Sequence, residues 1–177
     1  MAGNVQKTKP LDDARIKFLL ARYSALRKEM QNRNANHYQM ISLNLIISAS
    51  ILTFGLQPSS PASVLFVIPI MSMLLATVST HNVIAGKELG IIIKNDIETE
   101  FNFVSKGISS QKHPFPGSLG VIAASGIFIT VQTLGLILGL IKLQNYTTLD
   151  IVLIFIDVIS LLVTLILANI SIRSAKD

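Results

Sequence analysis

Cysteine is absent from the 177-residue chain. Its absence excludes a disulfide framework, a thiolate metal site and a cysteine nucleophile. Charged side chains are also scarce, at 14% of the residues, and none occurs between Asn34 and Gly86. A soluble domain would have to bury this whole uncharged stretch in one core, whereas a bilayer accepts about 20 such residues in each helix. The missing charge therefore indicates a membrane protein.

Sequence motifs for catalysis are missing as well. The chain contains no Gly-x-x-x-x-Gly-Lys-Ser/Thr loop, no His-Glu-x-x-His helix and no Gly-x-Ser-x-Gly turn. His37 and His81 have no third ligand nearby in the sequence, so the case for a metal site is weak. We therefore predict neither an enzyme nor a bound cofactor or metal ion.

The uncharged stretch is broken by Gln57-Pro58-Ser59-Ser60-Pro61, which predicts two membrane-spanning helices joined by a tight turn. A second apolar pair follows a loop that contains Pro114, Pro116 and Gly117. The sequence thus predicts an all-α integral membrane protein with four transmembrane helices. The predicted spans are Gln39–Leu56, Ser63–Thr80, with a bend at Pro69, Leu119–Ile141 and Leu149–Ile172.

Basic residues are unevenly distributed along the chain. Eight lysines and arginines precede the first span, four lie between the second and third, and two follow the fourth, while only Lys142 falls elsewhere. Because basic residues are retained on the cytoplasmic side, both termini are predicted to be cytoplasmic, in a bacterial inner membrane. The predicted parts are a basic helix (1–38), a hairpin (39–82), a cytoplasmic helix and loop (83–118), a second hairpin (119–172) and a tail (173–177).

Two cytoplasmic helices are predicted to continue the first two spans. Between Leu11 and Arg33, apolar residues recur at alternating gaps of three and four, which places them on one helix face. A similar stripe, Ile93, Ile97, Phe101 and Val104, follows the second span. Since the two spans are antiparallel neighbours, we expect these stripes to pack against each other.

Asp157 lies about two turns inside the fourth span, where an ionisable group costs roughly 2.5–3.5 kcal/mol unless it meets water or a partner. Polar residues at helical spacing continue its face, and a second polar stripe follows the third span. One interpretation is a water-filled path in an oligomer; the other is that Asp157 is protonated or hydrogen-bonded inside the bundle. The candidate lining residues are Asp157, Asp150, Thr164, Ser160, Gln132, Ser125 and Asn44.

The basic N-terminal helix admits three interpretations: attraction to anionic lipid, helix packing, and a binding surface for a nucleotide or oligonucleotide messenger or for a soluble sensor protein. The candidate contact residues are Arg15, Arg22, Arg27, Lys28 and Arg33. His37 and His81 lie at the inner ends of the first two spans and are candidates for an interfacial switch.

The segment Ala21-Arg22-Tyr23-Ser24-Ala25-Leu26-Arg27-Lys28-Glu29, the span after it and the charged helix from His81 to Glu98 resemble small bacterial membrane proteins. They also resemble the membrane effectors of anti-phage defence, of the SLATT type and the Pycsar transmembrane type. The resemblance implies a homo-oligomeric pore that permeabilises the inner membrane when infection is sensed. The alternatives are a non-conducting scaffold that recruits a soluble partner and a small proton-coupled transporter.

Overall fold

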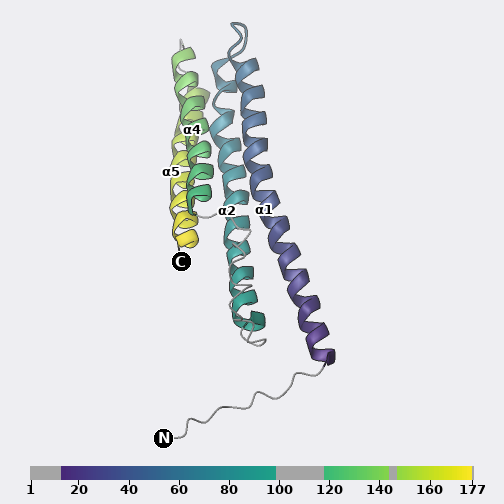
Figure 1. Cartoon of the computed structure of the whole chain (residues 1–177). Helices are drawn as coiled ribbons and strands as arrows, with labels where there is room; N and C mark the ends of the chain where they lie inside the picture. Colours follow the sequence, from purple (N-terminus) through teal and green to yellow (C-terminus); the bar gives the residue numbers. More distant parts are fainter. Residues whose placement is uncertain (1–12, 99–117, 144–146, 177) are drawn as a thin grey trace, which may run out of the picture.

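The computed structural model describes residues 13–98, 118–143 and 147–176, and the regular structure in these ranges is entirely helical. Figure 1 shows their order along the chain. The elements are α1 (Asp13–Gly55), the 3-10 helix η1 (Ala62–Val64), α2 (Val67–Ile92), the π-helix η2 (Ile93–Glu98), α4 (Ser118–Lys142) and α5 (Thr148–Lys176).

Four of these helices are long and apolar enough to cross a membrane: α1, α2 continued by η2, α4 and α5. This confirms the predicted all-helical fold and the number of apolar helices. α1 is continuous over 43 residues. The predicted basic helix and the predicted first span are therefore one helix, since neither proline nor glycine occurs between Asp13 and Phe54.

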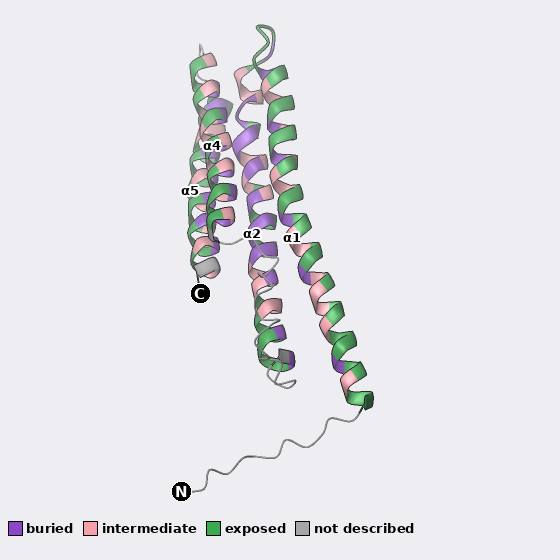
Figure 2. Ribbon diagram, viewed as in Figure 1, coloured by how far each residue is buried: buried purple, intermediate pink, exposed green. Residues whose placement is uncertain are grey.

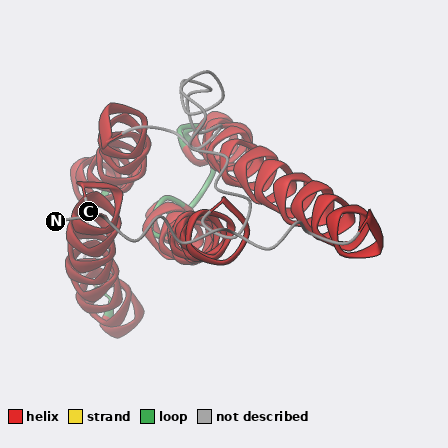
Figure 3. Ribbon diagram, turned by 60° about the horizontal axis from the view of Figure 1, so that its bottom comes forward, coloured by secondary structure: helices red, strands yellow, loops and turns green. Residues whose placement is uncertain are grey.

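The helices run alternately up and down, and α2 contacts each of the other three (Figures 1 and 3). α1 packs on one side of α2, and the α4–α5 pair packs on the other. We call the end at which α1 meets η1, and α4 meets α5, the turn end. α1 begins and α5 ends on the opposite side, as expected for an even number of crossings.

α1, and α2 together with its continuation η2, project beyond the α4–α5 pair (Figure 1). We call this part, residues 13–33 of α1 together with 87–98 of α2 and η2, the extension. Leu19 and Met30 of α1 are buried there, and so are Ile93 and Ile97 of η2. α1 contacts η2 directly, so the predicted packing of the two apolar stripes is present. Phe101, Val104 and the predicted loop at 111–117 lie outside the described residues.

The predicted bend at Pro69 is wrong. η1 delays the start of α2 to Val67, so that Pro69 is the third residue of the helix. The first turn of a helix has no intrahelical acceptors for its N–H groups, and a proline there removes no hydrogen bond. The turn before η1 is closed by backbone hydrogen bonds from Gln57 to Phe54 and from Ser60 to Gln57.

Two glycines of α4 allow close contact with the start of α2. A Cβ atom built on Gly135 would lie 2.9 Å from Cβ of Ile68, and one on Gly139 would lie 2.5 Å from the ring of Phe66. Ile68 and Phe66 are themselves fully buried. The Gly-x-x-x-Gly pair thus contacts α2 and its N-terminal cap inside the chain, as close-packing pairs of this kind do.

Candidate functional site

Buried polar side chains occupy the middle of the helix bundle, where an apolar core would be expected. Figure 2 shows that the buried positions of each helix form one face, while the exposed positions, mostly aliphatic on α4 and α5, point outward. We call the buried set the polar core. Its members are His37, Asn44, Ser48, Ser72, Ser79, Thr80, Gln132, Asp157, Ser160, Thr164 and Ser171.

α5 contributes a straight line of polar side chains to this core. Asp157, Ser160, Thr164 and Ser171 follow one another at steps of three, four and seven residues, which is the spacing of a single helix face. Their exposed fractions are 0%, 1%, 2% and 2%, respectively. The predicted polar stripe therefore exists, but it faces the inside of the four-helix unit and not its outer surface.

Hydrogen bonds join part of the polar core across the helices. Gln132 of α4 donates from Nε2 to Oγ1 of Thr164 over 2.7 Å, and Thr164 donates in turn to the carbonyl oxygen of Ser160 over 2.9 Å. Ser72 of α2 donates to the carbonyl oxygen of Phe128 on α4 over 3.3 Å. These contacts hold the candidate residues Gln132, Thr164 and Ser160 in one cluster.

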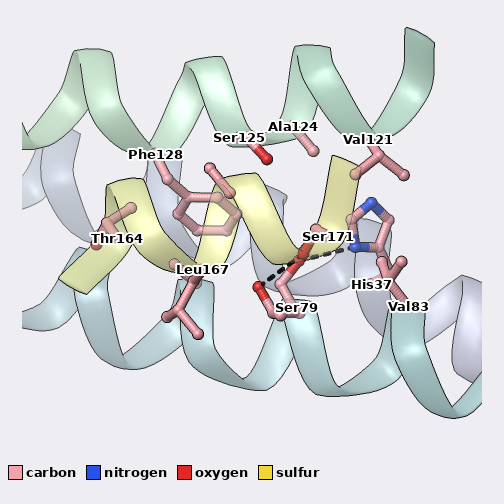
Figure 4. A pocket seen from close by; sticks show the side chains of 13 residues that line it. His37, Ser79, Val83, Val121, Ala124, Ser125, Phe128, Thr164, Leu167 and Ser171 are labelled. Atoms are coloured by element: carbon pink, nitrogen blue, oxygen red, sulfur yellow. Dashed lines mark hydrogen bonds between the residues drawn. The ribbon is translucent and has the colours of Figure 1, made fainter. Parts of the chain in front are cut away.

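A second cluster lies closer to the extension. Nδ1 of His37 on α1 is 2.7 Å from Oγ of Ser79 on α2, and Ser171 of α5 donates to Thr80 of α2 over 3.2 Å. All four helices meet here around a small hollow, shown in Figure 4, which is only wide enough for a water-sized molecule. The candidate residue Ser125 lines the hollow from α4.

Several buried atoms of the polar core have no hydrogen-bond partner among the described residues. They are both carboxylate oxygens of Asp157, the amide nitrogen and oxygen of Asn44, Nε2 of His37 and Oε1 of Gln132. A buried polar group without a partner costs about 1–3 kcal/mol, and an ionised one costs more. Such groups gather at sites that work with water or an ion more often than in passive cores.

Asp150, another candidate, has a local structural role. Its Oδ2 accepts hydrogen bonds from the N–H of Thr147 at 3.0 Å and from the Thr147 hydroxyl at 2.6 Å. The N–H of Asp150 donates back to Oγ1 of Thr147 over 3.2 Å. This reciprocal pair is a capping box at the start of α5, which satisfies N–H groups that the helix leaves unpaired.

The two candidate histidines are not brought together. His37 is 2% exposed and bonded to Ser79, whereas His81 is exposed on the other side of α2. Ser79 and His81 are two residues apart, and positions two apart on a helix face different directions. The prediction that the two histidines lie close together considered only their depth along the antiparallel helices. The face that α2 turns toward α1 determines the contact, and this face carries Ser79.

Lys142, the one basic residue outside the predicted cytoplasmic segments, has a structural role at the turn end. Its Nζ donates to the carbonyl oxygens of Gly55 and, over 2.6 Å, Gln57, and to Oγ of Ser60 over 2.9 Å. The ammonium group thereby caps the last carbonyls of α1 and ties both helix pairs together at the turn end. One feature of the sequence could have indicated this structural role: Lys142 is the one basic residue that lies away from the predicted cytoplasmic segments.

Lys142→Met is expected to lower the free energy of unfolding by about 1.5–3 kcal/mol, the range for hydrogen bonds to a charged group. The variant keeps an unbranched side chain but removes all three donations. Thermal unfolding in detergent would measure the loss. Lys17→Met, at an exposed position of α1, is the control, and equal melting temperatures for the two variants would contradict a structural role for Lys142.

The candidate basic residues of α1 do not gather into one pocket. Arg22 pairs with Asp96 of η2 at 3.1 Å, Arg33 pairs with Glu29 of its own helix at 2.9 Å, and Arg27 donates to the Tyr23 hydroxyl over 2.9 Å. Lys28 and Arg15 are exposed. The Arg22–Asp96 pair connects α1 to η2, the other arm of the extension.

The polar core places a carboxyl group, an imidazole and several hydroxyls inside the bundle, and these are groups that exchange protons and bind water. Within residues 13–98, 118–143 and 147–176, no three His, Cys, Asp or Glu side chains gather closely enough to hold a metal ion. No family model, no curated protein and no solved structure matches the chain.

Proposed function

We propose that the chain is a subunit of a membrane channel, in which the four apolar helices cross the bilayer and the polar core provides the path for ions. In this proposal the extension is cytoplasmic, because the basic residues outside the apolar segments are concentrated there. The turn end then faces the opposite side. The membrane is the inner membrane of a bacterium.

The single observation that carries the proposal is the set of unpartnered polar atoms in the core. Asp157 is 0% exposed and neither of its oxygens has a hydrogen-bond partner among the described residues, although an aliphatic residue could be buried there at no such cost. Asn44 repeats the pattern on α1, at 1% exposed. Ionisable groups deep inside apolar helices mark ion and proton pathways, where they face the bundle interior or water.

The extension supplies a gate. Its two arms are held by buried apolar contacts at Leu19, Met30 and Ile97, and by the half-exposed ion pair between Arg22 and Asp96. α1 and α2 both continue unbroken from the extension into the part that holds His37 and Ser79. A movement of one arm against the other is therefore transmitted to the polar core through rigid helices.

The test is flux through the purified chain in vesicles of phosphatidylethanolamine and phosphatidylglycerol. The vesicles are loaded in turn with a gradient of potassium, of sodium and of protons, and dissipation is followed with a potential-sensitive or pH-sensitive dye. Dissipation of at least one gradient, absent from protein-free vesicles, supports a channel. Tight vesicles under all three gradients, for both the parent chain and the gate variant described next, would refute it.

Arg22→Glu is the gate variant, because it places two carboxylates opposite each other where an ion pair now lies. Half-exposed pairs are worth about 0.2–1 kcal/mol, so we expect a roughly two- to fivefold rise in flux. The double variant Arg22→Glu/Asp96→Arg restores the pair and should return flux to the parental value. Lys17→Glu makes the same charge change at an exposed position of α1, and an equal rise in this control would contradict a gate at Arg22.

A scaffold is the second candidate, and one observation favours it. Phe18 and Leu20, in the extension, are 64% and 51% exposed, so a partner that covered either of them would remove apolar surface from water. A scaffold would recruit a soluble partner there and would not need Asp157. It predicts that Phe18→Ala abolishes function in cells while Asp157→Asn leaves it intact; a channel predicts the reverse.

The setting that we propose is anti-phage defence, in which a homo-oligomer of the chain permeabilises the membrane of an infected cell. Support comes from the resemblance of residues 21–29 and 81–98 to defence effectors. A cytoplasmic messenger or sensor protein would act on the extension. Phage plating on cells that carry the gene tests the setting, with the oligomer measured by particle size in detergent. Unchanged plaque numbers would reject the defence role without rejecting the channel.

A further inference from the structure

We infer that the species that moves through the polar core is a proton, exchanged by Asp157 and His37 within each four-helix unit. This inference depends on the proposed function, because it names the ion of the proposed channel. It also places the path inside one subunit and not on an axis between subunits.

Asp157 and His37 are the two members of the polar core that bind and release protons. Both are buried, at 0% and 2% exposed, and both keep unpartnered atoms: the two carboxylate oxygens of Asp157 and Nε2 of His37. Nδ1 of His37 is occupied by Ser79, which fixes the ring and leaves Nε2 for exchange. A group that must take up and give up a proton needs such an unoccupied atom.

The two groups lie at different depths of the bundle. His37 and Ser171 line the same hollow, and Ser171 is fourteen residues beyond Asp157 on α5. At 1.5 Å for each residue, this separates Asp157 from the level of His37 by about 20 Å, most of the thickness of a bilayer core. One group thus serves the turn end and the other serves the end that bears the extension.

The part of the bundle between Thr164 and His37 holds a hollow bordered by hydroxyl groups, and Asp157 lies beyond its lining, seven residues before Thr164 on α5. The hollow extends from Thr164 at one end to His37 at the other, with Ser125 and Ser171 along it (Figure 4). Asn44 lies two helical turns from His37 on the same face of α1 and offers an amide whose nitrogen and oxygen are both unpartnered. Hydroxyls and amides hold water by donating and accepting hydrogen bonds, as a chain for proton transfer requires.

The hollow has no room for the hydration shell of a metal ion. It accepts a water-sized molecule, whereas a sodium or potassium ion needs a ring of oxygen ligands that replaces its hydration shell. Of the 13 residues around the hollow, His37 is the one that can carry a charge. None of these 13 lining residues is a carboxylate, so a metal cation would meet no counter-charge from them, whereas an imidazole binds a proton covalently.

Each transfer conserves atoms and charge. A proton from the turn end binds a carboxylate oxygen of Asp157, and the resulting O–H bond then breaks as the proton passes to a water on the hydroxyl line. The proton forms an N–H bond at Nε2 of His37, giving an imidazolium ion, and leaves to water beside the extension. Both residues return to their starting forms, and the membrane potential or a proton gradient drives the net movement, with no oxidant or co-reactant.

The test uses the full-length chain in the same lipid vesicles. Proton uptake is driven by a potassium diffusion potential set with valinomycin, and acidification of the lumen is read with a pH-sensitive dye. Asp157→Asn and His37→Gln are each expected to lower the proton flux at least about tenfold. His81→Gln is the matched control, because this histidine is exposed and lies away from the hollow, and its flux should equal that of the parent.

The outcomes separate this inference from the proposed function. Sodium or potassium flux as large as the proton flux, unaffected by Asp157→Asn and His37→Gln, would overturn the proton assignment and leave a channel in place. No flux of any ion would overturn both. To exclude misfolding, each variant must elute in gel filtration as the parent does. Loss of proton flux in both folded variants supports the relay, and parental flux in either folded variant would overturn it.

Discussion

Asp157→Leu is expected to raise the stability of the chain while it abolishes ion passage. Leucine has the same branch at Cγ as aspartate, but it replaces two unpartnered oxygens by methyl groups in a fully buried site. Removing an ionisable group from the middle of an apolar helix recovers roughly 2–3 kcal/mol. For a chain of this size, this is a rise of about 5–10 °C in melting temperature.

Asp150→Leu is the matched control, since it makes the same replacement seven residues earlier on the same helix. Asp150 closes the capping box with Thr147, so its loss should lower stability by about 1 kcal/mol. The two variants are thus expected to shift the melting temperature in opposite directions. If Asp157→Leu lowered the melting temperature as much as Asp150→Leu does, Asp157 would be a residue that stabilises the fold. The view that Asp157 lowers stability for the sake of function would then be wrong.

The comparison of these two aspartates shows what the sequence could predict. Both lie on one face of the predicted fourth span, and that shared face made both candidates for the lining of a path. The structure separates them, because Asp150 has Thr147 three residues before it and Asp157 has no such neighbour. The capping signal was present in the sequence, and it distinguishes a carboxylate that is satisfied locally from one that is not.

The four apolar helices and the packed stripes of the extension were predictable for a simple physical reason. Both depend on the hydropathy of residues near one another in the sequence, such as the missing charges from Asn34 to Gly86 or the helical spacing of Leu19 and Met30. Such patterns report the environment of a helix face without any knowledge of its partner.

Contacts between distant residues were not predictable in this way. Lys142 meets Gly55 across 87 residues, and His37 meets Ser79 and not His81 because of the rotation of α2 about its own axis. The position of Pro69 in the first turn of α2 depends on η1, a short helix that has no distinct hydropathy pattern. These features arise only when the helices are packed together.

Gly139→Ala is expected to be the most destabilising single-methyl addition on α4. Its new Cβ would lie 2.5 Å from the ring of Phe66, closer than any ordinary contact. Phe66 is itself 0% exposed and has no room to turn away. Overpacking of this kind costs about 1–3 kcal/mol, so thermal unfolding in detergent should show a clearly lower melting temperature.

Gly126→Ala supplies the control on the same helix, because a Cβ at Gly126 meets nothing within 4 Å. Alanine is favoured over glycine inside a helix by about 1 kcal/mol, so this variant should be as stable as the parent or more so. The difference between the two variants then isolates the contact of α4 with Phe66. If Gly139→Ala were as stable as Gly126→Ala, α4 would have to lie farther from the start of α2 than it does in the structure. The two helix pairs would then be less tightly packed against each other near Lys142.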